Sequence, residues 1–284
     1  MNTSTLPIPV VCMLFVILLF SSCRQSRNAL SEPLQPLPVE KGDLRISGSV
    51  GGFSDANLAA NLQAAYKVAD KYSAGLNLYG IGPKTRNRRG DDYAKSYMAE
   101  AFIGTNWFKR LSTFQEGTGE KVLSPHNGLL FDVNLGYGIN GISSQAGEEN
   151  VFVFPSSGGG ENLNGNINFH TRYAFLQTGL TVQSKWVNVG MSLRGVGMKY
   201  IHGEVNGQQF TRRQDMFVAQ AEEEGIFTYL VTAFRFSVGG SKVKVFTTVS
   251  VVSNVFDEKT MAHLPRPLMI GVEFNIGAKG REED

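Results

Sequence analysis

Residues 243–251 have the sequence VKVFTTVSV, in which two sets of side chains alternate with a period of two. The odd positions carry four valines and a threonine, and the even positions carry Lys244, Phe246, Thr248 and Ser250. Residues 268–276 (LMIGVEFNI) and 131–140 (FDVNLGYGIN) alternate in the same way. Successive side chains of a β-strand point to opposite faces, so these stretches predict strands with one face suited to hydrocarbon and one polar face.

Ten stretches of this kind follow residue 42, and almost no segment beyond that residue shows a helical period. They are expected at 43–53, 58–68, 72–81, 96–108, 128–141, 165–183, 186–203, 226–239, 242–253 and 267–277. Most contain at least the 9–11 residues that a tilted strand needs to cross a bilayer, whereas strands of soluble sheets usually have about five or six.

The connections between these stretches alternate in length. Short turns are expected at 69–71, 184–185 and 239–241, and long polar loops at 82–95, 142–164, 204–225 and 254–266. Transmembrane barrels have short periplasmic turns and long outer loops, and ten strands would leave both termini at the short-turn end. Two connections depart from the alternation, because 54–57 is short for an outer loop and 109–127 is long for a turn.

The side chains on the two faces favour a membrane barrel over a soluble sheet. Tyr72, Trp107 and Trp186 fall at the predicted short-turn end, where an interfacial aromatic girdle is expected. A soluble sheet would carry many Lys and Glu residues on its solvent face, but the polar faces here carry mostly Asn, Gly, Ser and Thr. Within hydrocarbon, backbone N–H and C=O groups cannot bond to water and must pair with each other. Every strand therefore needs a partner on both sides, so the sheet must close on itself.

We therefore predict an all-β fold, a ten-stranded antiparallel up-and-down transmembrane β-barrel over residues 42–277 with a polar tail at 278–284. A soluble, lipid-tethered β domain is the alternative. Composition supports neither a disordered nor a fibrous chain, since charged residues make up 18% and 32 of the 284 residues are Gly. The net charge of +2 gives no reason to expect a nucleic-acid partner.

Metal and cofactor sites are not expected. The two cysteines, Cys12 and Cys23, both lie at the N-terminus, so they cannot build a disulfide framework or a cysteine-based zinc site. The four histidines are far apart in the sequence and show no ligand spacing.

The first 23 residues predict export. Residues 10–20 (VVCMLFVILLF) are too short to span a bilayer but suit the apolar core of a signal peptide. The following Ser21-Ser22-Cys23 resembles the lipobox of bacterial lipoproteins, although Phe20 stands where that motif usually has an aliphatic residue and no Lys or Arg precedes the apolar run. An ordinary signal peptide or an uncleaved anchor is the alternative.

The lipobox resemblance implies a signal peptide over 1–22 and a mature chain acylated at Cys23. Residues 23–41 are polar and Pro-rich, which predicts a flexible tether. The residues after Cys23 lack the acidic run that resembles surface-export signals, so the lipid anchor is expected on the periplasmic side of the outer membrane. The signal and the strand layout together resemble the β-barrel lipoproteins of Bacteroidota-type outer membranes, a resemblance that brings no catalytic motif.

Charged residues on the polar faces of the predicted strands would form a charge network in the lumen. They are Arg45, Lys67, Glu100, Asp132, Arg172, Arg194, Arg235, Lys244 and Glu273. Arg45 on the first strand and Glu273 on the last become neighbours on closure, so they are the first pair expected. Barrels of about eight strands are filled by side chains and open channels need about sixteen, so ten strands predict a filled lumen of paired charges.

The register is least certain at 165–183. Leu176, Leu180 and Val182 fall on the same face as Arg172 there, and a slip of one residue at a bulge would exchange the two faces.

The function expected from this pattern is a non-catalytic structural or accessory component of the envelope. Its surroundings are outer-membrane lipids, and its long loops would contact an envelope protein partner or an external ligand. The alternative is a narrow anion-preferring channel, because six of the nine lumen charges are basic. A third reading is a rim-site enzyme like the omptin proteases, with Asp91, Asp92 and His202 as candidates. No omptin motif or Gly-x-Ser-x-Gly elbow is present, so no catalytic residue is predicted.

Overall fold

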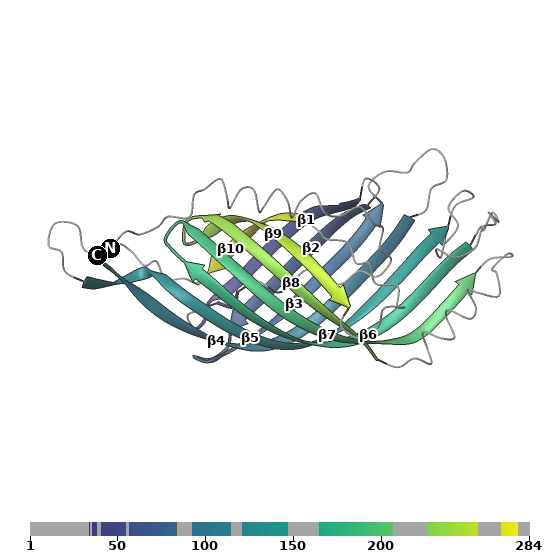
Figure 1. The fold of residues 1–284 in the computed structure, drawn as a ribbon, viewed down its shortest axis with the longest axis horizontal. Helices are drawn as coiled ribbons and strands as arrows, with labels where there is room; N and C mark the ends of the chain where they lie inside the picture. The colour runs from purple at the N-terminus through teal and green to yellow at the C-terminus, as the bar shows by residue number, and fades with distance from the viewer. Residues whose placement is uncertain are drawn as a thin grey trace.

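The structure is a computed structural model that describes residues 34, 36–38, 41–54, 57–83, 93–114, 121–146, 165–206, 226–254 and 268–277. Its ten strands form one closed antiparallel barrel in sequence order (Figure 1). The strands are β1 (Leu44–Ser54), β2 (Asn57–Lys67), β3 (Tyr72–Pro83), β4 (Tyr93–Phe114), β5 (Lys121–Ala146), β6 (Gly165–Gln183), β7 (Val187–Asn206), β8 (Ile226–Gly239), β9 (Val243–Asn254) and β10 (Leu268–Ile276). The predicted fold class is therefore confirmed.

The seam of the barrel joins its first and last strands. β1 pairs with β10 from Leu44↔Ile276 to Gly52↔Leu268, while its other edge pairs with β2. Each strand thus has a partner on both sides, as closure within hydrocarbon requires. Both ends of the barrel domain lie at the short-turn end.

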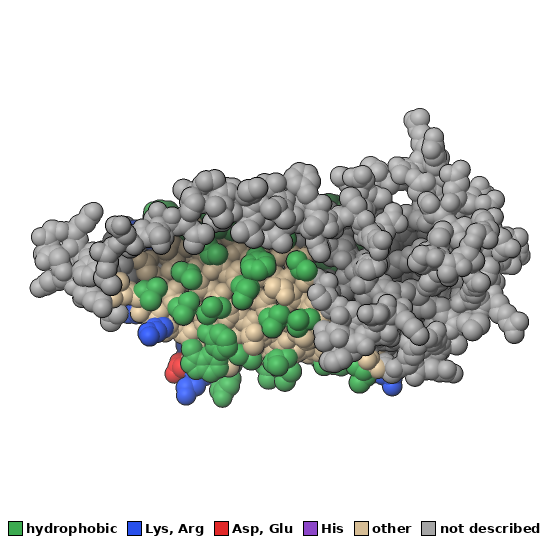
Figure 2. Space-filling model, in the orientation of Figure 1, with side chains coloured by type: hydrophobic (Ala, Val, Ile, Leu, Met, Phe, Trp, Pro, Cys, Tyr) green, Lys and Arg blue, Asp and Glu red, His purple; other side chains and the backbone are tan. Residues whose placement is uncertain are grey.

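The alternation in β9 and β10 separates the outer surface from the interior. Val243 and Val245 are exposed on the outside, whereas Lys244 and Phe246 are buried inside. In the view of Figure 2, hydrophobic side chains are spread over the described outer surface, with Lys and Arg side chains toward its ends. The exterior is therefore apolar and the interior largely polar, the reverse of a soluble barrel.

Aromatic side chains mark the short-turn end of this apolar band. Tyr72, Trp107 and Trp186 are all exposed there. Trp107 stacks on Phe131 with ring centroids 5.6 Å apart, and the ammonium of Lys185 lies 5.6 Å from the centroid of the Trp186 ring. This is the arrangement of an interfacial girdle. Within the described residues, no helix is long and apolar enough to cross a membrane.

Two connections differ in detail from the expected pattern. The predicted long turn at 109–127 is mostly strand, because β4 continues to Phe114 and β5 begins at Lys121, with an irregularity in their pairing between Arg110 and Ser112. This hairpin extends beyond the rest of the barrel (Figure 1). The alternation of apolar and polar residues does not extend into this hairpin, because the hairpin lies outside the apolar band and neither of its faces contacts hydrocarbon. The short connection at 54–57 is a tight link that pairs Ser54 with Asn57.

Part of the predicted tether lies inside the barrel. Leu34, Leu37 and Pro38 are buried, and Pro36 is partly buried. A Cβ added to Gly104 on β4 would lie 2.8 Å from Cδ1 of Leu37, so the glycine leaves room for this leucine. The expectation of a flexible tether over 23–41 is therefore wrong for these four residues, because their apolar side chains find an enclosed site.

Several predictions lie outside the described residues. They include the signal peptide, the acylation of Cys23, the polar tail 278–284, and Asp91 and Asp92 in the loop 82–95. The backbone of His202 belongs to β7, but its side chain lies outside the described part. The lipid anchor and the rim site remain predictions.

Candidate functional site in the barrel interior

The interior holds most of the charged residues that the sequence places on the polar strand faces. Eight of the nine are turned inward and are buried or nearly so: Arg45, Lys67, Glu100, Asp132, Arg194, Arg235, Lys244 and Glu273. They gather in two main groups at different depths.

Arg172 is the exception, because it is exposed on the outer surface of β6. Its assignment to the lumen is wrong. Leu176, Leu180 and Val182 are also exposed outward, so the face of β6 is set by these apolar residues. These apolar side chains face the hydrocarbon. Arg172 points to the same side of the sheet, because an even number of positions separates it from each of them.

The first group, which we call the mouth cluster, contains Arg45, Arg235, Lys244 and Glu273 and lies near the short-turn end. Glu273 Oε2 accepts a 2.5 Å hydrogen bond from Arg235 Nη2, and its Oε1 lies 3.4 Å from Arg45 Nε. Closure thus brings Arg45 beside Glu273, as expected. Lys244 faces Glu273 across the β9–β10 ladder. Three cations therefore share one carboxylate.

Two further contacts hold the arginines of the mouth cluster in place. The guanidinium of Arg235 lies 3.8 Å from the centroid of the Phe246 ring, close enough for a cation–π contact. Arg45 Nε donates a 2.9 Å hydrogen bond to Asn275 Oδ1. The side chains of both arginines are still 11% exposed, so the cluster is not sealed.

The second group, the central pair, consists of Glu100 on β4 and Arg194 on β7. Arg194 Nη2 donates to Glu100 Oε1, and the two side chains are at most 1% exposed. Tyr173 Oη and Asn77 Nδ2 also donate to this carboxylate, at 2.7 and 2.8 Å. The guanidinium of Arg194 lies 3.7 Å from the centroid of the Phe175 ring. The pair links strands that are not neighbours in the sheet, so it bridges the interior.

The two remaining charged residues have amide partners. Lys67 Nζ donates to Asn106 Oδ1, and Asn134 Nδ2 donates a 2.8 Å hydrogen bond to Asp132 Oδ1. A Cβ at Gly179 would lie 2.7 Å from Asp132 Oδ2, so the glycine leaves space for this carboxylate.

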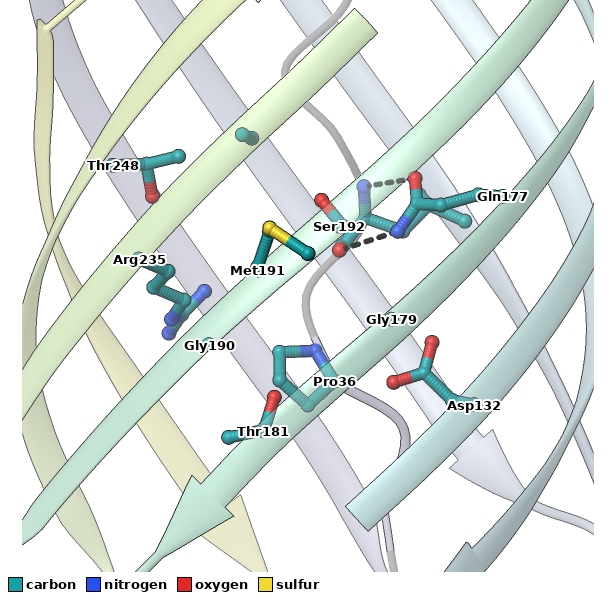
Figure 3. A pocket seen from close by; sticks show the side chains of 12 residues that line it. Pro36, Asp132, Gln177, Gly179, Thr181, Gly190, Met191, Ser192, Arg235 and Thr248 are labelled. Carbon is teal, nitrogen blue, oxygen red and sulfur yellow. Dashed lines mark hydrogen bonds between the residues drawn. The ribbon is translucent and has the colours of Figure 1, made fainter. Parts of the chain in front are cut away.

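Leu34 and residues 36–38, which together we call the N-terminal segment, are bound between the two groups. Gln177 contacts Leu34 twice, since its Oε1 accepts from the Leu34 amide and its Nε2 donates to the Leu34 carbonyl, both at 2.9 Å (Figure 3). Arg45 Nη1 donates to the carbonyl of Pro36, and Asn106 Nδ2 donates to that of Pro38 at 2.7 Å. The segment thus runs inward from the mouth to the level of the central pair, because Gln177 pairs with Arg194 in the β6–β7 register.

A small cavity remains beside this segment. It has a volume of about 30 Å³, and Leu34, Pro36, Asp132, Gln177 and Arg235 are among the residues that line it. One water molecule needs roughly 10–15 Å³, so the cavity suits one or two waters but no larger solute.

Sequence reasoning missed the residues that organise the interior. Gln177, Asn106, Asn77 and Tyr173 are uncharged, and nothing in their spacing distinguishes them from other polar residues on the inward faces. The signal for the bound segment is the pair of leucines within PLQPLP (33–38), which a solvated tether does not need. In the described part of the chain, no group of three or more His, Cys, Asp or Glu could hold a metal ion.

Neither a protein-family model nor a curated protein matches the sequence. Among solved structures, the chain is similar to "KdgM porin" and to "KdgM porin in complex with disordered oligogalacturonate", each with 10% identity, a TM-score of 0.30, and coverage of 82% of this chain and 98% of that one. It is also similar to "CdiB from Acinetobacter baumannii", with 8% identity, a TM-score of 0.26, and coverage of 83% of this chain and 60% of that one. At these values we carry over neither substrate nor mechanism.

Proposed function

We propose that this barrel is a narrow outer-membrane channel for small anionic solutes, which the N-terminal residues inside it hold closed. The observation that carries the proposal is the mouth cluster, where Arg45, Arg235 and Lys244 surround the carboxylate of Glu273 and outnumber the carboxylates even when nearby Asp132 is counted. Charged side chains that line a constriction select for ions of the opposite sign. A surplus of cations at the short-turn mouth would therefore favour anions and exclude cations.

In this proposal, the N-terminal segment closes the channel. Leu34, Leu37 and Pro38 fill the space that a solute would need, and the cavity beside them is about 30 Å³. The side chains of Gln177, Arg45 and Asn106 make polar contacts to the segment. Withdrawal of the segment would break these hydrogen bonds and uncover the cations of the mouth cluster. No catalytic step forms part of this function.

A permanently filled barrel with a structural or accessory role is the second candidate. The central pair favours it, because Arg194 and Glu100 bridge the interior and are at most 1% exposed. A bridge of this kind braces the wall and narrows the path even without the segment. The barrel would then serve as a rigid support whose long loops contact an envelope partner or an external ligand.

Single-channel recording in planar bilayers separates the two candidates. The full-length protein is compared with a Gln177→Ala/Asn106→Ala variant, which loses the hydrogen bonds to Leu34 and Pro38. The matched control is Asn140→Ala, which removes an interior amide that is bonded to Ser96 instead. We expect the double variant to open far more often than the wild type and the control, with a reversal potential that shows anion preference.

Two results would reject the channel. If neither the wild type nor the double variant ever conducts in bilayers that contain folded barrel, the interior is permanently filled. If the channel opens but conducts cations better than anions, the mouth cluster does not select for anions. Heat-modifiable migration on a detergent gel reports for each variant whether the barrel has folded.

A further inference from the structure

Two cations face the bilayer side by side on the outer surface of the barrel. Arg172 on β6 and Lys199 on β7 are both exposed, and they are direct partners in the β6–β7 register. Exposed cations are rare on the lipid side of a barrel wall, because at the membrane midplane they cost about 2–4 kcal/mol each. Their depth in the membrane therefore decides whether they are tolerated.

The pair lies near the long-loop edge of the apolar band, with Ile201 exposed just beyond Lys199 on β7. From Val182 to Arg172 the strand advances about ten residues, or roughly 33 Å at 3.3 Å per residue. A tilt of about 45° reduces this to roughly 23 Å of height, close to the 25 Å of a barrel's apolar band. The same number of residues separates Val189 from Lys199 on β7. Both cations thus lie at the headgroup level on the long-loop side.

The surroundings of the pair offer positive charge and apolar contact. Like charges directly opposite each other in a sheet are destabilising, so an anion between the two cations would relieve their repulsion. Their outward neighbours on the same strands and in the same row of the sheet are uncharged: Ile139, Ala174, Gly197 and Ile226. His170, which is also exposed, lies two residues from Arg172. Ile226 is 71% exposed and would contact an acyl chain below the headgroup.

We propose that Arg172 and Lys199 form a binding site for the phosphate of an anionic membrane lipid. The guanidinium of Arg172 can donate two parallel hydrogen bonds to phosphate oxygens, and the ammonium of Lys199 adds a second charge from the neighbouring strand. One phosphate would remove the repulsion between the cations, while its acyl chains lie on the apolar wall. The site is on the outer surface, so it does not depend on whether the lumen conducts.

Native mass spectrometry of the whole protein tests the site. The protein is purified in detergent, mixed with phosphatidylglycerol or with zwitterionic phosphatidylcholine, and the retained lipids are counted. The test variant is Arg172→Gln/Lys199→Gln. The control variant is Lys71→Gln/Lys242→Gln, which removes the same charge from exposed positions in short turns. A surface cation contributes about 1 kcal/mol to anionic-lipid binding, so we expect the test variant to bind phosphatidylglycerol roughly 25-fold more weakly.

The expected result is selective loss in the test variant, with phosphatidylcholine retention and the control variant unchanged. The proposal is wrong if the test variant retains phosphatidylglycerol as the wild type does, or if the control loses it equally. It is also wrong if millimolar inorganic phosphate binds the wild type and displaces the lipid, because the site would then serve the free anion. Arg172→Lys provides a second variant that keeps the charge, and we expect partial retention from it.

Discussion

The central pair and the mouth cluster are built from the same residue types but differ in charge balance. Glu100 and Arg194 match one to one, are at most 1% exposed, and the carboxylate receives two further hydrogen bonds. The mouth cluster sets three cations against Glu273, and its two arginines are 11% exposed. An unpaired charge is prohibitively costly only where water is excluded, so a surplus can exist near the opening but not at the centre.

Removal of one residue of the central pair should reduce the stability of the barrel more than any other change. Glu100→Gln leaves the guanidinium of Arg194 buried without a counter-charge, and we expect the free energy of unfolding to fall by about 3–5 kcal/mol. Urea unfolding in lipid vesicles measures this change. The control is Glu100→Leu/Arg194→Met, which replaces both charges by apolar groups and should recover most of the loss. A double variant as unstable as the single one would show that the pair is not the source of the effect.

The corresponding change in the mouth cluster should cost less. Glu273→Gln leaves Arg45, Arg235 and Lys244 without their shared carboxylate, but the amide still accepts a hydrogen bond and water reaches the arginines. We expect a loss of about 1–3 kcal/mol in the same unfolding assay. If Glu273→Gln destabilises the barrel more than Glu100→Gln, the contrast drawn between the two regions fails.

The N-terminal segment lies between the two regions and can be disturbed by a substitution at Gly104 on β4, which lies beside Leu37. Gly104→Ala places a Cβ against Asn134 Oδ1, Leu37 Cδ1 and the carbonyl oxygen of Val133, and overpacking of this kind costs about 1–3 kcal/mol. We expect faster hydrogen exchange at the amides of Leu34 and Leu37, together with a loss of about 1–3 kcal/mol in the unfolding of the barrel, because the Cβ also meets Asn134 and the backbone of Val133 on β5. Gly195→Ala is the control, because a Cβ there meets nothing within 4 Å. Equal exchange in both variants would mean that Gly104 does not accommodate the segment.

The smallest effect is expected far from both polar regions. Trp107→Ala removes the stacked contact with Phe131, which is worth about 0.5–1.5 kcal/mol beyond the buried area. Unfolding in vesicles should show this modest loss, while conductance stays as in the wild type. A change in conductance would show that the girdle is coupled to the interior.

The barrel was predictable because hydrocarbon and the interior impose opposite demands on successive residues. In β9 and β10 the alternating apolar set that begins at Val243 and at Leu268 faces out, although Phe246 and Met269 are apolar and lie inside, and the pairing of Arg45 with Glu273 follows from closure alone. The same rule misplaced Arg172, because beyond the apolar band the outside is wet and a charge no longer indicates the lumen. The alternation of apolar and polar residues therefore shows which side chains point outward only in the part of a strand that lies within the membrane.

The organisation of the interior could not be predicted in the same way. Which side chain meets Glu100 across the lumen depends on strand tilt and stagger, and these are not encoded in local periodicity. The bound segment was hidden for a different reason. Proline-rich sequence usually predicts an extended, solvated chain, and the hydrogen bonds of Gln177 to Leu34 join positions 143 residues apart.

The seam between β1 and β10 has a consequence for how the protein is made. Arg45 and its hydrogen-bond partner Asn275 are separated by 230 positions, so the wall cannot be completed until β10 is available to pair with β1. Until the nine residues of β10 arrive, β1 and β9 each present a row of unpaired amides and carbonyls that could pair with any other exposed strand. A barrel without these nine residues would keep two open edges, so β10 is required for closure.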